Sequence, residues 1–471
     1  MKRNWQRSAF IACVATGCYS QPAEDGDGST TAATGSASTG PGAGTGDASG
    51  IDPSSDAETT IPAPTTTADP TGDPPTGCQS SADCDNPSLP LCIDGTCGNC
   101  GDAEDPDSAC EELDTSAPIC NGADCVQCTD ATHCGGMTPA CERSTGTCVS
   151  CQYHEQCPGS ACDIFDGECL PTDQVWWVAL SCPGGNAGIG SEQSPFCDIA
   201  EALAQIPPGG IGTVFVSGGG PNDEAIDVGG GRTIAFLGVD GPVFFWPSLV
   251  PDVPAVRVGD ATVYLQEFHL EGRDSYAIEG VTGSRIGLDR CVIHQSSNAD
   301  NVRLTNSQLI ARNTAIGNAG LTQSMMPFAA IAANGSTLDL TYVTVMDNHG
   351  VGAPDGIVCD AATTGAMRNS IVFEDGPPPV DSIDCTGLSI THSATNQLEP
   401  GEGNVAIPIQ FDYDMIDVTG DNYYGLSAGS ALIPIVQGVA QWEAGDPVVD
   451  FDGDPRPLVP GTPDFPGADI P

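Results

Sequence analysis

The stretch VYLQEFHL, from Val263 to Leu270, is the first of six related segments in the C-terminal half of the chain. The other five are IGLDRCVI, LIARNTAI, LDLTYVTV, GAMRNSIV and LSITHSAT, which begin at Ile286, Leu309, Leu338, Gly365 and Leu388. Successive segments start 23, 23, 29, 27 and 23 residues apart. An internal period of this length predicts an architecture in which each repeat packs on its neighbours.

The apolar positions of each segment predict two short strands separated by a bend. Val263 and Leu265 alternate as residues on one face of a strand do, and Phe268 and Leu270 alternate again. Leu265 and Phe268 are three positions apart, not two, so the chain must turn between them. The two residues at the turn are polar in every copy: Gln266–Glu267, Asp289–Arg290, Arg312–Asn313, Thr341–Tyr342, Arg368–Asn369 and Thr391–His392. Asparagine suits this bend because it tolerates left-handed backbone.

A third short strand precedes each segment, as in AVRV at Ala255 and NVRL at Asn301. Three strands per repeat with a polar two-residue bend resemble a right-handed parallel β-helix of the pectate lyase type. The resemblance covers residues 175–471 and extends to both ends of that region. A short amphipathic segment, Asp198 to Gln205, is similar to the capping helix of such domains, and DFDGDPRPLVPGTPDFPGAD is similar to their closing segment. We therefore expect an all-β solenoid with stacked apolar columns inside.

Residues 78–170 carry 16 of the 23 cysteines. They divide into four units: Cys78, Cys84, Cys92, Cys97; Cys100, Cys110, Cys120, Cys125; Cys128, Cys134, Cys141, Cys148; and Cys151, Cys157, Cys162, Cys169. Each Cys-x-x-Cys is then the junction between two units. We expect disulfides, because each unit has an even count and little apolar material for a core. Zinc is the alternative, since His133 and His154 stand near cysteines with zinc-ribbon spacing, and the pairing within a unit stays open among three possibilities.

The N-terminus resembles that of a secreted Gram-negative lipoprotein. Three basic residues precede a short apolar run from Ala9 to Ala15, and the end of that run is similar to a lipobox that stops at Cys18. The resemblance implies a signal peptide over residues 1–17 and lipid on Cys18, with plain secretion as the alternative. Tyr19 would favour the outer membrane. We expect the cell envelope, with the protein sorted to the outer membrane, exposed at the surface or secreted.

Residues 18–77 are rich in Ser, Thr, Gly, Asp, Ala and Pro and have almost nothing apolar to bury. Such a segment cannot offset the entropy lost on ordering, so we expect a disordered linker. No later segment has the 18 or more apolar residues of a membrane-spanning helix, so the membrane would be reached through the lipid alone.

The formal charge of −50 would become −53 once the signal removes Lys2, Arg3 and Arg7, and no lysine would remain. Nucleic-acid binding requires basic groups that neutralise phosphates, so this charge excludes it. Anionic polysaccharides would be repelled as well. No motif demands a cofactor, but such acidity makes calcium possible.

The resemblance to lyases implies calcium-binding carboxylates and an Arg or Lys base on the outward face of the first strand. The outward positions aligned there are Arg257, Gly280, Arg303, Ala332 and Cys359, with Asp300 and Asp355 just upstream. Only the two arginines fit that chemistry.

The hydrolase relatives need clustered aspartates around a histidine and a basic substrate clamp. VMDNHGVGAPDG offers Asp347, His349 and Asp355, but the paired aspartates and the Arg-x-Lys pattern are missing. We therefore expect most outward polar residues to keep a solenoid soluble without performing chemistry.

Two further groups of residues are candidates for binding. Trp176, Trp177 and the run Phe244 to Trp246 could stack on sugars, although strand positions near a cap favour the core. The polar bend column could bind a ligand or be an ordinary turn ladder.

The stretch DFDGD places Asp450, Asp452 and Asp454 at calcium-like spacing. It lacks the remaining loop and the terminal Glu of an EF-hand. Pairing of these carboxylates with Arg456 is the alternative.

Five cysteines lie in the repeat domain. Cys182 and Cys197 flank the cap segment, while Cys359 and Cys385 fall in adjacent repeats, so each pair can reach disulfide distance. Cys291 is expected to stay a buried thiol.

These expectations describe a lipoprotein with a linker, a disulfide-rich region and a β-helix displayed for adhesion or carbohydrate binding. A neutral glycan or a protein is the expected partner, and the chain is expected to act as a monomer. The alternative is a carbohydrate-active enzyme of the polysaccharide lyase or glycoside hydrolase type.

Overall fold

The computed structural model describes residues 77–470, apart from 87, 143–144, 183–187, 219, 222–224, 247–252, 321–327, 347, 349–354, 374–381, 409–425 and 427–429. The expected signal peptide, Cys18 and almost all of the expected linker therefore lie outside the described residues. Asp347 and His349 lie outside them as well.

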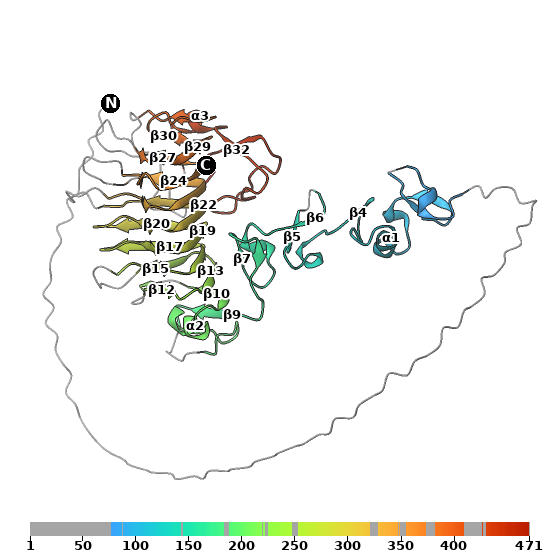
Figure 1. Cartoon of the computed structure of the whole chain (residues 1–471), viewed down its shortest axis with the longest axis horizontal. Coiled ribbons are helices and arrows are strands. Elements are labelled where there is room, and N and C mark those ends of the chain that lie inside the picture. Colours follow the sequence, from blue (N-terminus) through green and yellow to red (C-terminus); the bar gives the residue numbers. More distant parts are fainter. Residues whose placement is uncertain are drawn as a thin grey trace, which may run out of the picture. The chain divides into compact units, whose positions relative to one another are not determined.

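Residues 175–470, which we call the head, form a right-handed parallel β-helix whose strands stack in three columns (Figure 1). The first column contains β12 (Ile226–Gly229), β15 (Val256–Gly259), β18 (Ile278–Val281), β21 (Val302–Thr305), β23 (Ile331–Asn334), β25 (Ile357–Cys359) and β28 (Ile383–Asp384). The second contains β9 (Val175–Ala179), β10 (Ile211–Ser217), β13 (Thr233–Val239), β16 (Thr262–Gln266), β19 (Arg285–Asp289), β26 (Thr364–Arg368) and β29 (Leu388–Thr391). The third contains β11 (Gly220–Pro221), β14 (Val243–Trp246), β17 (Phe268–Arg273), β20 (Val292–Ser296), β27 (Ile371–Phe373), β30 (Ala394–Thr395) and β31 (Val405–Ala406). Two long strands, β22 (Gln308–Gly317) and β24 (Thr337–Met346), pass through the bend and belong to the second and third columns.

The strand register confirms the alignment of the six segments. Val263 pairs with Ile286, and the same line continues through Leu309, Leu338, Gly365 and Leu388. Gly365 stands where the other copies have larger residues, because a Cβ there would lie 1.9 Å from the carbonyl oxygen of Leu338.

The bend between the second and third columns is left-handed in all six segments. Its second residue has a positive φ each time: 59° at Glu267, 49° at Arg290, 44° at Asn313, 56° at Tyr342, 55° at Asn369 and 49° at His392. The prediction for the two asparagines is thus confirmed. The bend also contains Glu, Arg, Tyr and His, residue types that seldom adopt a positive φ. The surrounding turn must therefore hold them in this backbone conformation. We call these residues and the polar residues that precede them the bend ladder.

The core follows the inward columns. Leu270, Ile293, Ile316, Val345 and Val372 form one line, and each is completely buried. Each such side chain contributes roughly 1.5–3 kcal/mol by burial. The helix α2 (Ile199–Gln205) caps one end, and the Asp198 carboxylate accepts a hydrogen bond from the backbone N–H of Glu201 at 2.7 Å. A second apolar cluster, which includes Phe373, Leu432 and Val436 of α3 (Ile433–Val436), lies at the other end.

Residues 78–170, which we call the neck, contain four small units with one antiparallel hairpin each. The hairpins are β1 (Leu91–Ile93) with β2 (Thr96–Gly98), β3 (Ile119–Asn121) with β4 (Asp124–Val126), β5 (Ala140–Glu142) with β6 (Thr147–Val149), and β7 (Cys162–Asp163) with β8 (Glu168–Cys169). Single 3-10 turns precede them at Ser81–Asp83, Cys100–Asp102, Ala131–His133 and His154–Gln156. In the second unit Cys110 lies within a helix, α1 (Pro106–Leu113).

In each unit of the neck the first cysteine pairs with the third and the second with the fourth. The bonds are Cys78–Cys92, Cys84–Cys97, Cys100–Cys120, Cys110–Cys125, Cys128–Cys141, Cys134–Cys148, Cys151–Cys162 and Cys157–Cys169. The sulfurs are committed to one another, so the zinc alternative is wrong. Disulfides at this density are typical of proteins outside the cytoplasm.

The head has two disulfides, Cys182–Cys197 and Cys359–Cys385, and Cys291 is a buried free thiol. Among the described residues, no helix has the length and apolar character needed to span a bilayer.

Candidate functional site

The outward face of the first column carries an ordered line of charges. Its register runs through Asp227, Arg257, Glu279, Arg303, Ala332, Val358 and Asp384. The expected assignments of Gly280 and Cys359 to this line are wrong by one residue. Gly280 faces inward, where a Cβ would lie 2.9 Å from the Leu304 side chain, so Glu279 takes the outward place.

Both arginines of this face have partners. Arg257 pairs with Glu279 at 3.3 Å, and the Arg303 guanidinium lies 5.1 Å from the Tyr276 ring centre while it donates to the Tyr276 hydroxyl. Each guanidinium is therefore engaged with a neighbouring side chain on this face.

Asp300 and Asp355, the two upstream aspartates, each accept a hydrogen bond within the β-helix. Asp300 accepts a hydrogen bond from the Ala329 backbone N–H at 2.9 Å, and burial raises the pKa of its carboxyl. Asp355 is buried, and its backbone carbonyl accepts from the N–H of Ala330 at 2.8 Å. The structure therefore places Asp300 near Arg303.

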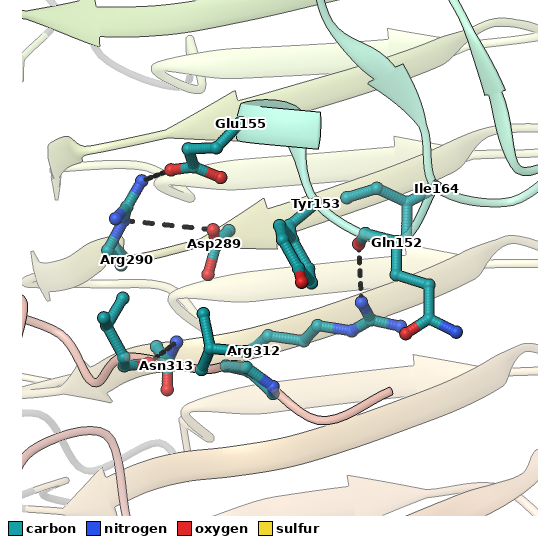
Figure 2. Close-up of a pocket in the computed structure, with 11 residues that line it drawn as sticks. Gln152, Tyr153, Glu155, Ile164, Asp289, Arg290, Arg312 and Asn313 are labelled. Atoms are coloured by element: carbon teal, nitrogen blue, oxygen red, sulfur yellow. Dashed lines mark hydrogen bonds and ion pairs between the residues drawn. The ribbon is translucent and has the colours of Figure 1, made fainter. Parts of the chain in front are cut away.

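The fourth neck unit docks on the bend ladder. Glu155 receives a hydrogen bond from the Gln266 amide at 2.8 Å. Figure 2 shows its ion pair with Arg290 and the hydrogen bond that Arg312 donates to the Gln152 carbonyl at 2.7 Å. Arg285, at the start of β19 in the second column, donates two hydrogen bonds to the Asp166 carboxylate of the same neck unit, at 3.0 and 3.1 Å.

The C-terminal segment docks on the same ladder further along. We call residues 440–470 the strap; it contains β32 (Ala440–Trp442) and β33 (Thr462–Asp464). The Asn313 amide donates to the Val449 carbonyl at 3.0 Å, and Asn369 exchanges two hydrogen bonds with the Gln441 backbone at 2.9 and 3.0 Å. The bend column is therefore a docking seam, an outcome that neither expected interpretation contained.

A cavity of about 240 Å³ lies where the neck and the strap leave part of the ladder uncovered. Asp289, Arg290, Arg312 and Asn313 contribute one side, and Figure 2 shows Glu155, Tyr153 and Gln152 opposite them. Burial raises the pKa of the Asp289 carboxyl to about 6, although Arg290 beside it acts in the opposite direction. The arginines are engaged with the neck, so the cavity offers little to an anionic ligand.

A second hollow of about 410 Å³ is lined by aromatic rings and carboxylates, and we call it the aromatic groove. Its lining residues are Pro242, Phe244, Glu267, His269, Arg290, Phe451, Asp452 and Gly453. Of the aromatic run expected in the core, Phe245 is buried but Phe244 is 37% exposed and lines this groove.

The rings of the aromatic groove contact one another. The His269 ring lies edge-on to Phe244 at 4.7 Å and stacks on Phe451 at 6.0 Å, measured between ring centres. Burial, with a smaller contribution from His294, lowers the pKa of His269 to about 4, so this imidazole is neutral at pH 7. Of the tryptophans, Trp177 packs on Phe215 and Trp176 packs against the core.

The strap also gathers carboxylates. Oxygens of Asp450, Asp452 and Asp454 lie within 4.8 Å of one another. The alternative expected these carboxylates to pair with Arg456, but Arg456 forms its ion pair with Asp464, at 3.2 Å. The sequence analysis missed a fourth carboxylate, Asp469. Burial and the negative charges of Asp452 and Asp450 raise its pKa to about 7.

The chain was compared with protein families, curated proteins and solved structures. Residues 65–175 match DUF8331, a family of unknown function, and no curated protein matches the chain. The structure of pectate lyase Pel9A is similar with a TM-score of 0.31 at 14% identity, over 63% of this chain and 96% of that one. ORF18 of Geobacillus virus E2 has a TM-score of 0.29 at 8% identity, over 48% of each chain. The GH136 lacto-N-biosidase from Eubacterium ramulus has a TM-score of 0.27 at 10% identity, over 49% of this chain and 54% of that one.

The chain thus spans about half the length of the viral protein and of the lacto-N-biosidase. At these identities and TM-scores the similarities assign no activity to this chain.

Proposed function

We propose that the protein acts outside the cytoplasm as a binding protein whose head holds a neutral glycan in the aromatic groove. The observation that carries this proposal is the combination of Phe244, His269 and Phe451 with the carboxylates of Glu267 and Asp452 in one hollow. Aromatic rings stack on the apolar faces of sugars, and carboxylates accept hydrogen bonds from hydroxyl groups.

The charges in the groove favour a neutral ligand over an acidic one. Arg290 is the only cation among the residues that line it, and this guanidinium pairs with Glu155 and with Glu267, the latter at 3.3 Å. A uronate would meet two carboxylates and no unengaged cation there. The formal charge of −50 adds repulsion at longer range.

A binding role also fits the first column better than catalysis does. Arg257 and Arg303 are held by Glu279 and Tyr276, so the charge ladder resembles a solvated, self-neutralising surface. We therefore place the lyase and hydrolase interpretation second.

We test glycan binding with the purified full-length protein on an array of neutral oligosaccharides, with polygalacturonate and alginate as acidic probes. Binding of a neutral oligosaccharide should weaken at least tenfold in Phe244→Ala, because the ring is exposed and its loss leaves the core intact. Leu398→Ala, which removes an apolar side chain that is 68% exposed elsewhere, is the matched control and should bind normally. Unsaturated products from either acidic polymer, formed with calcium and abolished by Arg303→Ala, would instead establish the lyase alternative.

We also propose that Cys18 carries lipid and anchors the protein in the envelope. The apolar run that ends at this cysteine and the linker that follows support the proposal. Mass spectrometry of the membrane-extracted protein should find an acylated N-terminal cysteine. An unmodified mature N-terminus beyond Cys18 would show plain secretion.

A further inference from the structure

We infer that the strap binds a calcium ion through the carboxylates of Asp450, Asp452, Asp454 and Asp469. This site is separate from the glycan-binding role, and either can fail without the other.

The first observation is the geometry of the three aspartates in DFDGD. One carboxylate oxygen from each lies within 4.8 Å of the others. Calcium binds oxygen at about 2.3–2.6 Å, so oxygens around one ion lie up to roughly 5 Å apart. The three carboxylates therefore fit around a single ion without rearrangement of the backbone.

The second, independent observation is the state of Asp469. This residue is 4% exposed, and neither carboxylate oxygen has a hydrogen-bond partner among the described residues. A buried carboxylate without partners is costly, and proteins normally pair it, protonate it or bind a cation with it. Both of its chain neighbours are bonded to the same loop, because the Ile470 N–H donates to Asp450 and the Ala468 carbonyl accepts from Phe451, so this buried carboxylate lies beside the three aspartates.

The backbone of the strap holds this cluster in place. Asp450 is fully buried, and its Oδ1 accepts from the N–H groups of Gly453 and Asp454 at 3.0 and 2.7 Å. Its Oδ2 accepts from the N–H of Ile470 at 2.9 Å, and the Phe451 N–H donates to the Ala468 carbonyl at 2.9 Å. These bonds fix the loop against the segment that carries Asp469.

Arg456 acts on Asp450 and Asp469 electrostatically, but its hydrogen bonds go to other groups. Its guanidinium donates to Asp464 at 3.2 Å and to the carbonyls of Phe465, Gly467 and Ala468. Four carboxylates without a dedicated cation favour a hard metal ion with oxygen ligands. Magnesium demands near-ideal octahedral geometry at shorter distances, so an all-carboxylate cluster of this width favours calcium.

Calcium at this place would also stiffen one wall of the aromatic groove. Asp452 lines the groove together with its neighbours Phe451 and Gly453. An ion that bridges Asp452 and Asp469 ties this wall to the C-terminal end of the strap.

The test uses calorimetric titration of the full-length protein with CaCl2 at physiological salt, after removal of divalent ions with a chelator. We expect one saturable site above the weak background of other carboxylates, with magnesium bound at least tenfold more weakly. Calcium should raise the melting temperature by several degrees, because it binds the folded state alone. Asp469→Asn and Asp452→Asn should each weaken calcium at least tenfold, while Asp384→Asn, an exposed carboxylate on β28, should leave it unchanged.

The variants also separate loss of the site from loss of the fold. In the presence of chelator, Asp469→Asn should melt no lower than the wild type, because the amide removes a buried charge. The inference is overturned by a wild type without a saturable calcium site, by equal affinities for calcium and magnesium, or by an Asp469→Asn variant that retains the response. Phe244→Ala should bind calcium normally.

Discussion

Arg456 is a single buried side chain on which the closing segment of the head depends. It makes four hydrogen bonds within the strap, and its guanidinium lies 3.7 Å from the centre of the Tyr342 ring. Arg456→Met should lower the free energy of unfolding by about 3–5 kcal/mol, because it leaves the Asp464 carboxylate buried without its partner. Denaturant unfolding measures the loss.

Arg257→Met is the matched control for this prediction. Arg257 is 52% exposed and pairs with Glu279 at the surface. An exposed ion pair contributes about 0–1 kcal/mol, so this variant should stay close to the wild type. Equal losses in the two variants would contradict the role assigned to Arg456.

His154 should make stability depend on pH. It is buried, its Nδ1 accepts from the Cys162 backbone N–H at 3.1 Å, and burial lowers its pKa from 6.5 to about 4. Below about pH 6.5 this imidazole is protonated in the unfolded chain but stays neutral in the folded protein. The free energy of unfolding therefore decreases as the pH falls from 6.5 towards 4. The wild type should lose about 2–3 kcal/mol relative to His154→Asn between pH 7.5 and 4.5. If the free energies of unfolding of the wild type and of His154→Asn differ by the same amount at pH 7.5 and at pH 4.5, the assignment is refuted.

Prediction from the sequence succeeded at the residue scale where a column has a clear alternation. Leu270 and the residues stacked on it were placed correctly because their spacing is fixed by the strand. The outward line failed by one residue at Gly280, since a glycine has no side chain that marks its face, and the strand register pairs Arg257 with Glu279. Asp469 could not be found, because 14 residues lie between it and Asp454 and no spacing rule relates the two.

At the scale of elements, the bend ladder holds the strap through its asparagines. Asn369 has a φ of 55°, is buried and exchanges hydrogen bonds with the Gln441 backbone. Asn369→Gly keeps the left-handed backbone but leaves two part-buried backbone groups of Gln441 without their partner, so it should cost about 1–2 kcal/mol. Asn369→Ala should cost roughly 1 kcal/mol more, because alanine resists the left-handed conformation. Denaturant unfolding gives both losses.

Limited proteolysis gives a second measure of the same prediction. Both variants should release the strap faster than the wild type does. Asn306→Gly, at a left-handed position with a φ of 48° in another turn, should change stability by no more than about 0.5 kcal/mol. Equal stability of the glycine and alanine variants at position 369 would show that the backbone conformation there is unimportant.

The seam itself was beyond prediction from the sequence. The polar pairs of the bend were visible as a pattern, but their partners lie far away in the chain, such as Glu155 for Arg290 and Val449 for Asn313. No local period relates such residues. The sequence therefore predicted the polar pairs of the bend ladder but not the segments that dock on them.

At the scale of the whole molecule, neck and head have different sources of stability. The apolar core of the head extends through its whole stack of columns, whereas the described residues of the neck form small clusters around their cysteines and share one further cluster with the head. Reduction of the disulfides should unfold the neck and leave the β-helix standing. Mild proteolysis after treatment with a phosphine reductant should remove the neck and leave a core that starts close to Val175.

Circular dichroism provides the control, since the β-sheet signal of the head should persist in the reduced protein. Uniform cleavage along both regions would contradict this division, and so would a reduced neck that resists protease as well as the oxidised one does.

The closure of every neck disulfide within its own unit has a consequence for how such a protein arises. No bond joins two units, although only two residues separate the last cysteine of one from the first of the next. During export, each unit can finish its oxidation before the next emerges, without waiting for a distant thiol. Duplication or deletion of a whole unit during evolution leaves no unpaired cysteine. The number of units in the neck can therefore change without a change in the head.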